Sequence, residues 1–148
     1  MAAPLVTVLM PAFNASLYLR EAVDSILGQT VGDFELLVVD DGSTDETLEI
    51  LRSYHDPRIR IEASPENQGV TAALNRGLEL AEGRYVLRMD ADDISLPDRI
   101  ELQVRYMEEH PEVGVCGGSV HGFKADREFA APIPRAQRHD PMVCTLPF

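Results

Sequence analysis

Cysteine is scarce in this sequence, and the two that occur, Cys116 and Cys144, do not form a Cys-x-x-Cys pair. A secreted fold held by disulfides is therefore excluded, and two free thiols in a reducing compartment are expected. Tryptophan is absent, and the four histidines lack the spacing of a zinc site. No apolar run is long enough to span a membrane, and the N-terminus lacks the pattern of a signal peptide. A cytoplasmic location is expected, and a location at the inner face of the membrane is an alternative for the full-length protein.

Basic residues are also few. Lysine and arginine number 13 against 25 acidic residues, which gives a formal net charge of -12. Such a surface repels nucleic-acid phosphates and anionic lipids, so we expect no nucleic-acid partner. An acidic pocket still binds an anionic ligand when a divalent cation lies between them. The composition is otherwise that of a globular domain, with 45% hydrophobic and 26% charged residues.

Short apolar segments alternate with segments of helical periodicity along most of the chain. Strands are predicted at 5–10, 34–39, 58–62, 84–89 and 113–116, and helices at 16–28, 44–54, 70–81 and 97–109. The strand at 58–62 is expected near a sheet edge. Asn14 or Ser16 is expected to cap the first helix and Ser43 or Thr44 the second. In the third helix, Leu74, Leu78 and Ala81 are expected to point inward, and Gly83 to stop the helix.

This alternation predicts an α/β fold of three layers, α/β/α, around a mostly parallel sheet. From about residue 124 the periodicity ends and prolines recur, at 132, 134, 141 and 147. Residues 1–123 are therefore expected to form one ligand-binding half. Residues 124–148 are expected to be irregular and to lead toward a further part of the protein.

Acidic residues gather where the predicted strands end. Asp40 and Asp41 follow the second strand, and Asp90, Asp92 and Asp93 follow the strand at 84–89. Ligands of open parallel sheets bind beyond the carboxyl ends of the strands, so these groups are expected at one edge. Clustered carboxylates repel one another unless a cation neutralises them, and Mg²⁺ or Mn²⁺ is the natural candidate. Such a site suits a nucleoside diphosphate.

These acids also have other interpretations. Acidic residues after strands are often turn formers or helix caps, which is the reading favoured for Asp45, Asp98 and one of the pair Asp40 and Asp41. A phosphoacceptor domain would carry its acidic pair after the first strand, which instead ends in Pro-Ala-Phe-Asn. A nicotinamide-binding domain would carry Gly-x-Gly-x-x-Gly after that strand, and this motif is absent.

Longer motifs recur in a fixed order over residues 5–118. They include Met-Pro-Ala-Phe-Asn at 10–14, Asp-Asp-Gly-Ser-Thr-Asp at 40–45 and Asp-Ala-Asp-Asp at 90–93. Further segments lie at 25–30, 67–69, 75–77, 81–83 and 97–99. Together they resemble the opening of inverting glycosyltransferase family 2. The resemblance implies a Rossmann-like GT-A fold and an activated sugar donor, a nucleoside diphosphate sugar, with a UDP-sugar as the commonest case.

The resemblance also implies roles for individual residues. The nucleotide would be bound by Pro11, Ala12, Phe13, Asn14, Asp40, Asp41 and Asp90, with Phe13 where the family often has a stacking tyrosine. Asp92 would be the principal metal ligand, with Asp90 beside it and Asp93 as a weaker candidate. Asn67 and Arg76 are candidates for contacts to the phosphates, with a solvated helix face favoured for Arg76.

The resemblance implies transfer of the sugar to a saccharide or lipid-linked acceptor with inversion at the anomeric carbon. That step needs a general base, which the family places well past the Asp-x-Asp motif. No position before Phe148 matches it, so the chain is expected to be truncated before the base and to be inactive or incomplete alone. A non-catalytic module that binds nucleotide and metal is the alternative. Because a truncated fold leaves apolar surface uncovered, either an exposed apolar patch or a homo-oligomer that hides one is also expected.

Overall fold

The computed structural model describes residues 3–118 and the backbone of residues 143–146. Within this part of the chain the elements divide between two compact units, residues 1–98 and residues 99–148. None of the described helices is both long enough and apolar enough to cross a membrane.

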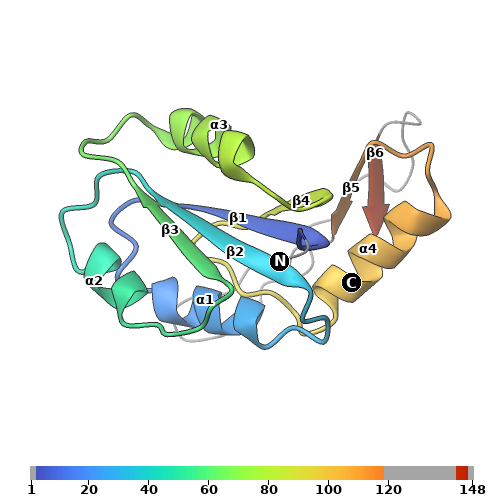
Figure 1. Ribbon diagram of the computed structural model, residues 1–148, viewed down its shortest axis with the longest axis horizontal. Coiled ribbons are helices and arrows are strands. Elements are labelled where there is room, and N and C mark those ends of the chain that lie inside the picture. The colour runs from blue at the N-terminus through green and yellow to red at the C-terminus, as the bar shows by residue number, and fades with distance from the viewer. Residues whose placement is uncertain (1–2, 119–142, 147–148) are drawn as a thin grey trace, which may run out of the picture. The chain divides into compact units, whose positions relative to one another are not determined.

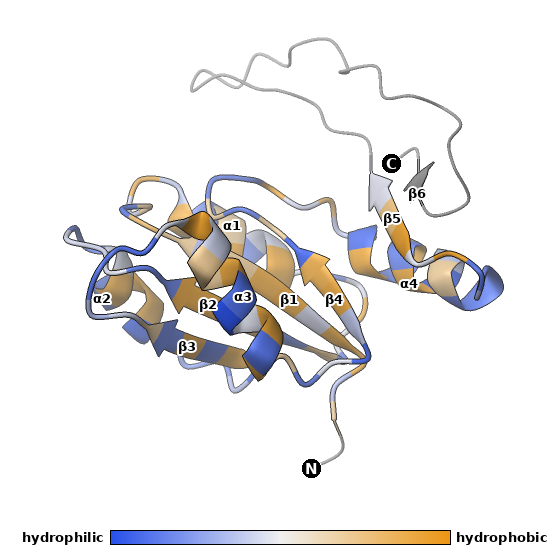
Figure 2. Cartoon of the chain, turned by 90° about the horizontal axis from the view of Figure 1, so that it is seen from above, coloured by the Kyte–Doolittle hydropathy of each residue, from blue (hydrophilic) through white to orange (hydrophobic). Residues whose placement is uncertain are grey.

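The first unit is built on a four-stranded parallel sheet in the order β3-β2-β1-β4. Its strands are β1 (Val6–Ala12), β2 (Phe34–Asp40), β3 (Ile59–Ala63) and β4 (Tyr85–Arg88). Every residue of β2 is buried, and Figure 2 shows β1 and β2 as mostly hydrophobic. Figure 2 shows β3 as more hydrophilic, as the predicted edge position requires.

Helices cover both faces of this sheet, which confirms the predicted α/β/α layering. Figure 1 shows α3 (Val70–Leu80) on one face, and α1 (Leu19–Leu27) and α2 (Thr47–Arg52) on the other. Leu9, Leu37, Val39 and Ala73 form the core beneath α3. Leu19, Ala22, Val23 and Ile26 give α1 a buried face at helical spacing.

The inward face of α3 matches the predicted one only in part: Leu74 packs against the core, as predicted, whereas Leu78 does not. Leu78 is 56% exposed, and the buried residues of the helix are Ala73 and Gly77. A Cβ at residue 77 would lie 2.1 Å from Leu9 Cδ1, so a larger residue here would force the buried Leu9 side chain to move. Small residues therefore face the sheet, and a leucine is turned to solvent.

Gly83 does not stop α3, although the sequence pattern predicts that it does. The helix ends at Leu80, and the next residue, Ala81, already has an extended backbone. A Cβ at residue 83 would lie 2.3 Å from the backbone nitrogen of Thr7. The Gly83 N–H also donates to Thr7 Oγ1 at 2.8 Å. The glycine is needed because the chain passes directly over β1.

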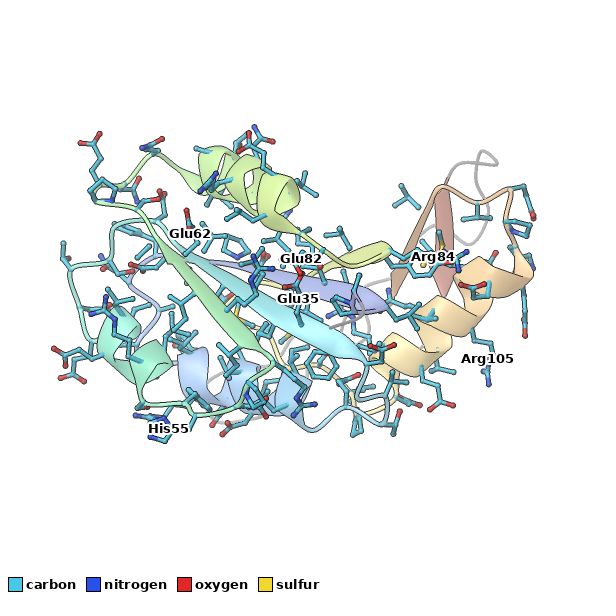
Figure 3. The ribbon with its side chains drawn as sticks, viewed as in Figure 1. Glu35, His55, Glu62, Glu82, Arg84 and Arg105 are labelled. Atoms are coloured by element: carbon cyan, nitrogen blue, oxygen red, sulfur yellow. The ribbon has the colours of Figure 1, made fainter. Side chains whose placement is uncertain are left out.

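A buried carboxylate fixes the same turn. Glu35 of β2 accepts hydrogen bonds from Thr7 Oγ1, from the backbone N–H of Glu82 and from Arg60 (Figure 3). Burial raises the pKa of Glu35, but these three donors outweigh it and hold the pKa below its ordinary value. The group ties β1, β2, β3 and the α3–β4 connection together near the amino ends of the strands.

The second unit contains α4 (Arg99–Glu109), β5 (Val115–Gly118) and β6 (Val143–Leu146). The strands β5 and β6 pair in parallel, with Val115 opposite Val143. The strand β6 lies within residues 124–148, where the sequence pattern predicts no regular element. The rest of that segment lies outside the described residues.

Candidate functional site

A cavity of about 470 Å³ opens at the carboxyl ends of β1, β2 and β4, within the size range of ligand sites. Parallel strands bring their following loops to one edge, and these loops supply most of its wall. Its lining residues are Pro11, Ala12, Phe13, Asn14, Ala15, Tyr18, Asp41, Asn67, Val70, Ala73, Arg88, Asp90, Ala91 and Asp92.

Most of the residues predicted from the sequence meet in this cavity. Those that line it are Pro11, Ala12, Phe13, Asn14, Asp41, Asp90 and Asp92. Asp40 and Asp93 are not among the lining residues. Asp40 is only 2% exposed, and its Oδ1 has no hydrogen-bond partner among the described residues. The side chain of Asp40 is therefore enclosed by the protein, whereas Asp41, the next residue, lines the cavity.

Asp41 is held at the start of α3. Its Oδ1 accepts from the backbone N–H of Gln68 at 2.9 Å, and its Oδ2 accepts from that of Gly69 at 2.7 Å. Its own N–H donates to the carbonyl of Ala12 at 2.8 Å. A carboxylate at a helix N-terminus is favoured by the helix dipole. Asp41 is therefore both a cavity acid and the group that fixes the loop bearing Asn67.

Asn14 connects the loops after β1 and β2. Its backbone is left-handed, with φ of 49°, a conformation that asparagine tolerates better than most residues. Its Oδ1 accepts from the Thr44 N–H at 2.8 Å, and its own N–H donates to Ser43 Oγ at 2.9 Å. The expected capping of α1 by Asn14 and of α2 by Ser43 or Thr44 is therefore wrong. These polar groups bind one another across the two loops.

Asp45 completes the connection between the loops. Its Oδ2 accepts from the Ser16 N–H at 3.1 Å, and its Oδ1 accepts from the Thr47 N–H at 2.9 Å. Thr47 Oγ1 in turn accepts from the Ala15 N–H at 2.8 Å. Partial desolvation raises the pKa of Asp45, but the bonds from Thr47 and Ser16 lower it well below its ordinary value. Asp45 is thus the turn former that the sequence suggested, and Ser16 is bound by it instead of capping α1.

Two aromatic side chains border the cavity. Phe13 is 48% exposed and Tyr18 is 45% exposed. An exposed aromatic face at a cavity mouth is available for stacking against a flat ring. Tyr18 lies directly before α1, on the loop held by the Asn14 and Asp45 contacts.

The acids after β4 form the polar end of the cavity. Arg88 Nη2 donates to Asp90 Oδ1 at 3.0 Å, and Asp92 is exposed beside them in the lining. No group of three metal-ligating side chains is gathered anywhere in the described residues. Mg²⁺ and Mn²⁺ commonly take one or two carboxylates and complete their shells with water and phosphate oxygens. Asp90 and Asp92 fit a cation shared with a phosphate ligand rather than one enclosed by the protein.

Several lining residues were not predicted. Tyr18 directly precedes α1 and Val70 begins α3, and only tertiary structure brings these two positions to the cavity. Arg88 was detectable, because it lies two residues before Asp90 at the end of a strand. Arg76 lies on the exposed face of α3, where it pairs with Glu62 at 2.7 Å and Glu79 at 3.4 Å. That arrangement matches the solvated face favoured for it.

The chain is similar to known proteins over most of its length. The sequence pattern of "Glycosyl transferase family 2" matches residues 7–143. An "Uncharacterized glycosyltransferase" of Haemophilus influenzae is 41% identical over 106 residues, which cover 70% of this chain and 42% of that protein.

Two solved structures share the fold. S. aureus TarS 1–349 in complex with UDP-GlcNAc matches with a TM-score of 0.76 and 28% identity, covering 88% of this chain and 37% of that one. The mannosyltransferase PcManGT from Pyrobaculum calidifontis, in complex with GDP-Man and Mn²⁺, matches with a TM-score of 0.71 and 30% identity. That match covers 79% of this chain and 36% of the other. The chain thus spans less than half the length of each of these three proteins.

Proposed function

The chain belongs to glycosyl transferase family 2, and on that premise we propose that its cavity binds a nucleoside diphosphate sugar together with a divalent cation. The observation that carries the proposal is the meeting of Phe13, Asp41 and Asp92 in one cavity, from three separate loops. Phe13 offers an aromatic face on which a nucleotide base can stack, and Asp41 offers a hydrogen-bond acceptor for the polar edge of that base. Asp92 offers an exposed carboxylate for a cation bound to the diphosphate.

The nucleoside is assigned to the β1–β2 side of the cavity. Phe13 and Tyr18 offer faces for stacking, and Asp41 offers its remaining lone pairs to an N–H of the base. Both Asp41 oxygens already accept a backbone N–H, so the carboxylate is oriented before the ligand arrives. Asn14 acts here by holding the loop rather than by binding the base with its Oδ1, which Thr44 already occupies.

The diphosphate is assigned to the β4 side. Asp92 and Asp90 are the proposed metal ligands. Their carboxylates are hard oxygen donors, which suit Mn²⁺ or Mg²⁺. A bound cation would offset the charge that develops on the departing diphosphate. The neighbour bound to GDP-Man and Mn²⁺ supports a cation in such a site, and the neighbour bound to UDP-GlcNAc supports a nucleotide-sugar donor.

For the whole protein we propose transfer of the sugar to a saccharide or lipid-linked acceptor, with inversion of the anomeric centre. Inversion requires a base that takes the acceptor proton on the face opposite the diphosphate. Asp41 is engaged by two backbone N–H groups and Asp90 is a proposed metal ligand, so neither is placed for that role. The base is accordingly proposed to lie outside this group of cavity acids.

Thermal unfolding with UDP and GDP, each with and without Mn²⁺, tests the binding site. At a ligand concentration 100 times the Kd, binding stabilises the fold by about 2.7 kcal/mol, which is a melting shift of roughly 5–10 °C at this size. Asp92→Asn should remove most of the Mn²⁺-dependent shift. The matched control is Asp33→Asn, which changes an exposed acid before β2 and should retain the shift. If neither nucleotide moves the wild-type transition, the binding proposal fails.

Turnover is a separate measurement. Release of free sugar and transfer to candidate acceptors can be followed with a labelled UDP-sugar. A chain that binds the donor but yields neither product supports the alternative of a nucleotide- and metal-binding module. Product formation that Asp92→Asn abolishes supports the enzyme.

A further inference from the structure

Arg88 is the one lysine or arginine among the lining residues of the cavity. It is the last residue of β4 and forms a forked contact with Asp90. Arg88 Nε and Nη2 donate to Asp90 Oδ1 at 3.1 and 3.0 Å, and Nη2 lies 3.3 Å from Oδ2. Among the described residues, the cavity therefore contains one cationic side chain, and it already binds one of the cavity acids.

This ion pair is suited to exchange. The side chains of Arg88 and Asp90 are 57% and 45% exposed, so water screens their attraction. Exposed pairs of this kind add little to folding stability. A ligand that offers Arg88 a second anion can therefore separate the pair without unfolding the strand end.

The contact also uses the oxygens that a metal ion would need. A cation at Asp90 would meet the positive guanidinium at hydrogen-bond distance from the same carboxylate. Two cations sharing one carboxylate repel each other. A diphosphate relieves this conflict, because arginine binds phosphate oxygens as a fork while the metal takes the freed carboxylate.

We propose that Arg88 exchanges partners during ligand binding, pairing with Asp90 in the ligand-free cavity and with the diphosphate when a nucleotide is bound. The assignment rests on the proposed function, because it takes the diphosphate and the cation as ligands. Arg88 then has opposite effects on the two ligands: it weakens binding of the cation alone and strengthens binding of the nucleotide.

Two titrations of the full 148-residue chain test this assignment. Mn²⁺ alone is titrated by electron paramagnetic resonance of the free ion, and UDP is titrated by calorimetry at saturating Mn²⁺. Arg88→Gln should tighten Mn²⁺ binding roughly fivefold and weaken UDP binding roughly tenfold. Arg88→Lys keeps the charge but loses the fork, so its Mn²⁺ affinity should stay near wild type and its UDP affinity should fall between the other two.

Arg84→Gln is the matched control. It removes the same charge just before β4, about 13 Å along the strand, which exceeds the screening length of physiological salt. Both affinities should stay at the wild-type value. If Arg88→Gln weakens both ligands together, its role is structural and the assignment is overturned; unchanged affinities overturn it as well. If the wild-type chain binds neither ligand, the proposed function itself fails.

Discussion

Substitution of Gly42 by alanine should disrupt both the stability of the first unit and the cavity. Gly42 follows Asp41 directly and has a left-handed backbone, with φ of 71°. A Cβ at this position would lie 2.5 Å from the carbonyl carbon of Glu66 and 2.7 Å from the nitrogen of Asn67. Both atoms belong to the backbone, so no rotation of a side chain can remove the overlap.

The magnitude follows from these two effects. A left-handed alanine is less favourable than glycine by about 1–2 kcal/mol. Carbon atoms in contact lie about 3.5–4.0 Å apart, so the backbone at Glu66 would have to move by about 1 Å. Overpacking of this kind costs about 1–3 kcal/mol, and the total of roughly 2–5 kcal/mol is a large share of a typical domain's stability. The displacement would also stretch the bonds from Gln68 and Gly69 to Asp41.

Urea unfolding followed by circular dichroism measures the loss, and UDP titration of the folded variant measures the effect on the cavity. Gly69→Ala is the first control, because its φ of 91° is also strained but nothing lies within 4 Å of the added Cβ. Gly32→Ala is the second control, with open space and no positive φ, and should stay within about 0.5 kcal/mol of wild type. The reasoning is refuted if Gly42→Ala is as stable as Gly32→Ala, since the loop would then not be packed against residue 42.

Two further substitutions test the polar contacts. Because hydrogen bonds lower the folded-state pKa of Glu35, its contribution is present above the ordinary value of 4.5 and is lost as pH falls through the lowered pKa. Glu35→Gln should therefore lower the free energy of unfolding by about 1–3 kcal/mol at neutral pH. The variant should also lose less stability than the wild type as the pH falls below the ordinary value of 4.5. Urea unfolding at several pH values measures this, and an equal loss at acid pH in both proteins would contradict the prediction. Asn14→Ala loses both the Thr44 bond and the tolerance of positive φ, whereas Asn14→Gly loses only the bond. The glycine variant should thus melt higher than the alanine variant, and equal melting temperatures would show that the backbone conformation is unimportant.

The architecture was predictable because it depends on periodicity. The buried run of β2 and the 3.6-residue spacing of α1 are local patterns, and they predicted elements within a few residues of those observed. The convergence of strand ends was predictable for the same reason, since parallel strands place their following loops at one edge. That rule alone brings Asn14, Asp41 and Asp92 together from distant parts of the chain.

What could not be predicted depends on distances between elements. Gly77 and Gly83 look like weak points of a helix and a turn, yet a Cβ at either position would overlap atoms of β1. The polar residues of the loops looked like helix caps because capping is a local pattern. Asn14 and Asp45 instead satisfy backbone groups of another loop, at separations of about 30 residues that no short-range rule detects.

Asp41 shows why stability and ligand recognition are coupled in this fold. Its carboxylate holds the N–H groups of Gln68 and Gly69, and its own backbone N–H is bound to the carbonyl of Ala12. A base that hydrogen-bonds to this carboxylate would use lone pairs left over from a structural contact. Loss of the carboxylate would therefore release the loop carrying Asn67 as well as the base. Substitutions at Asp41 cannot separate the two roles, whereas Asp92, which is exposed, can report ligand binding with little change in stability.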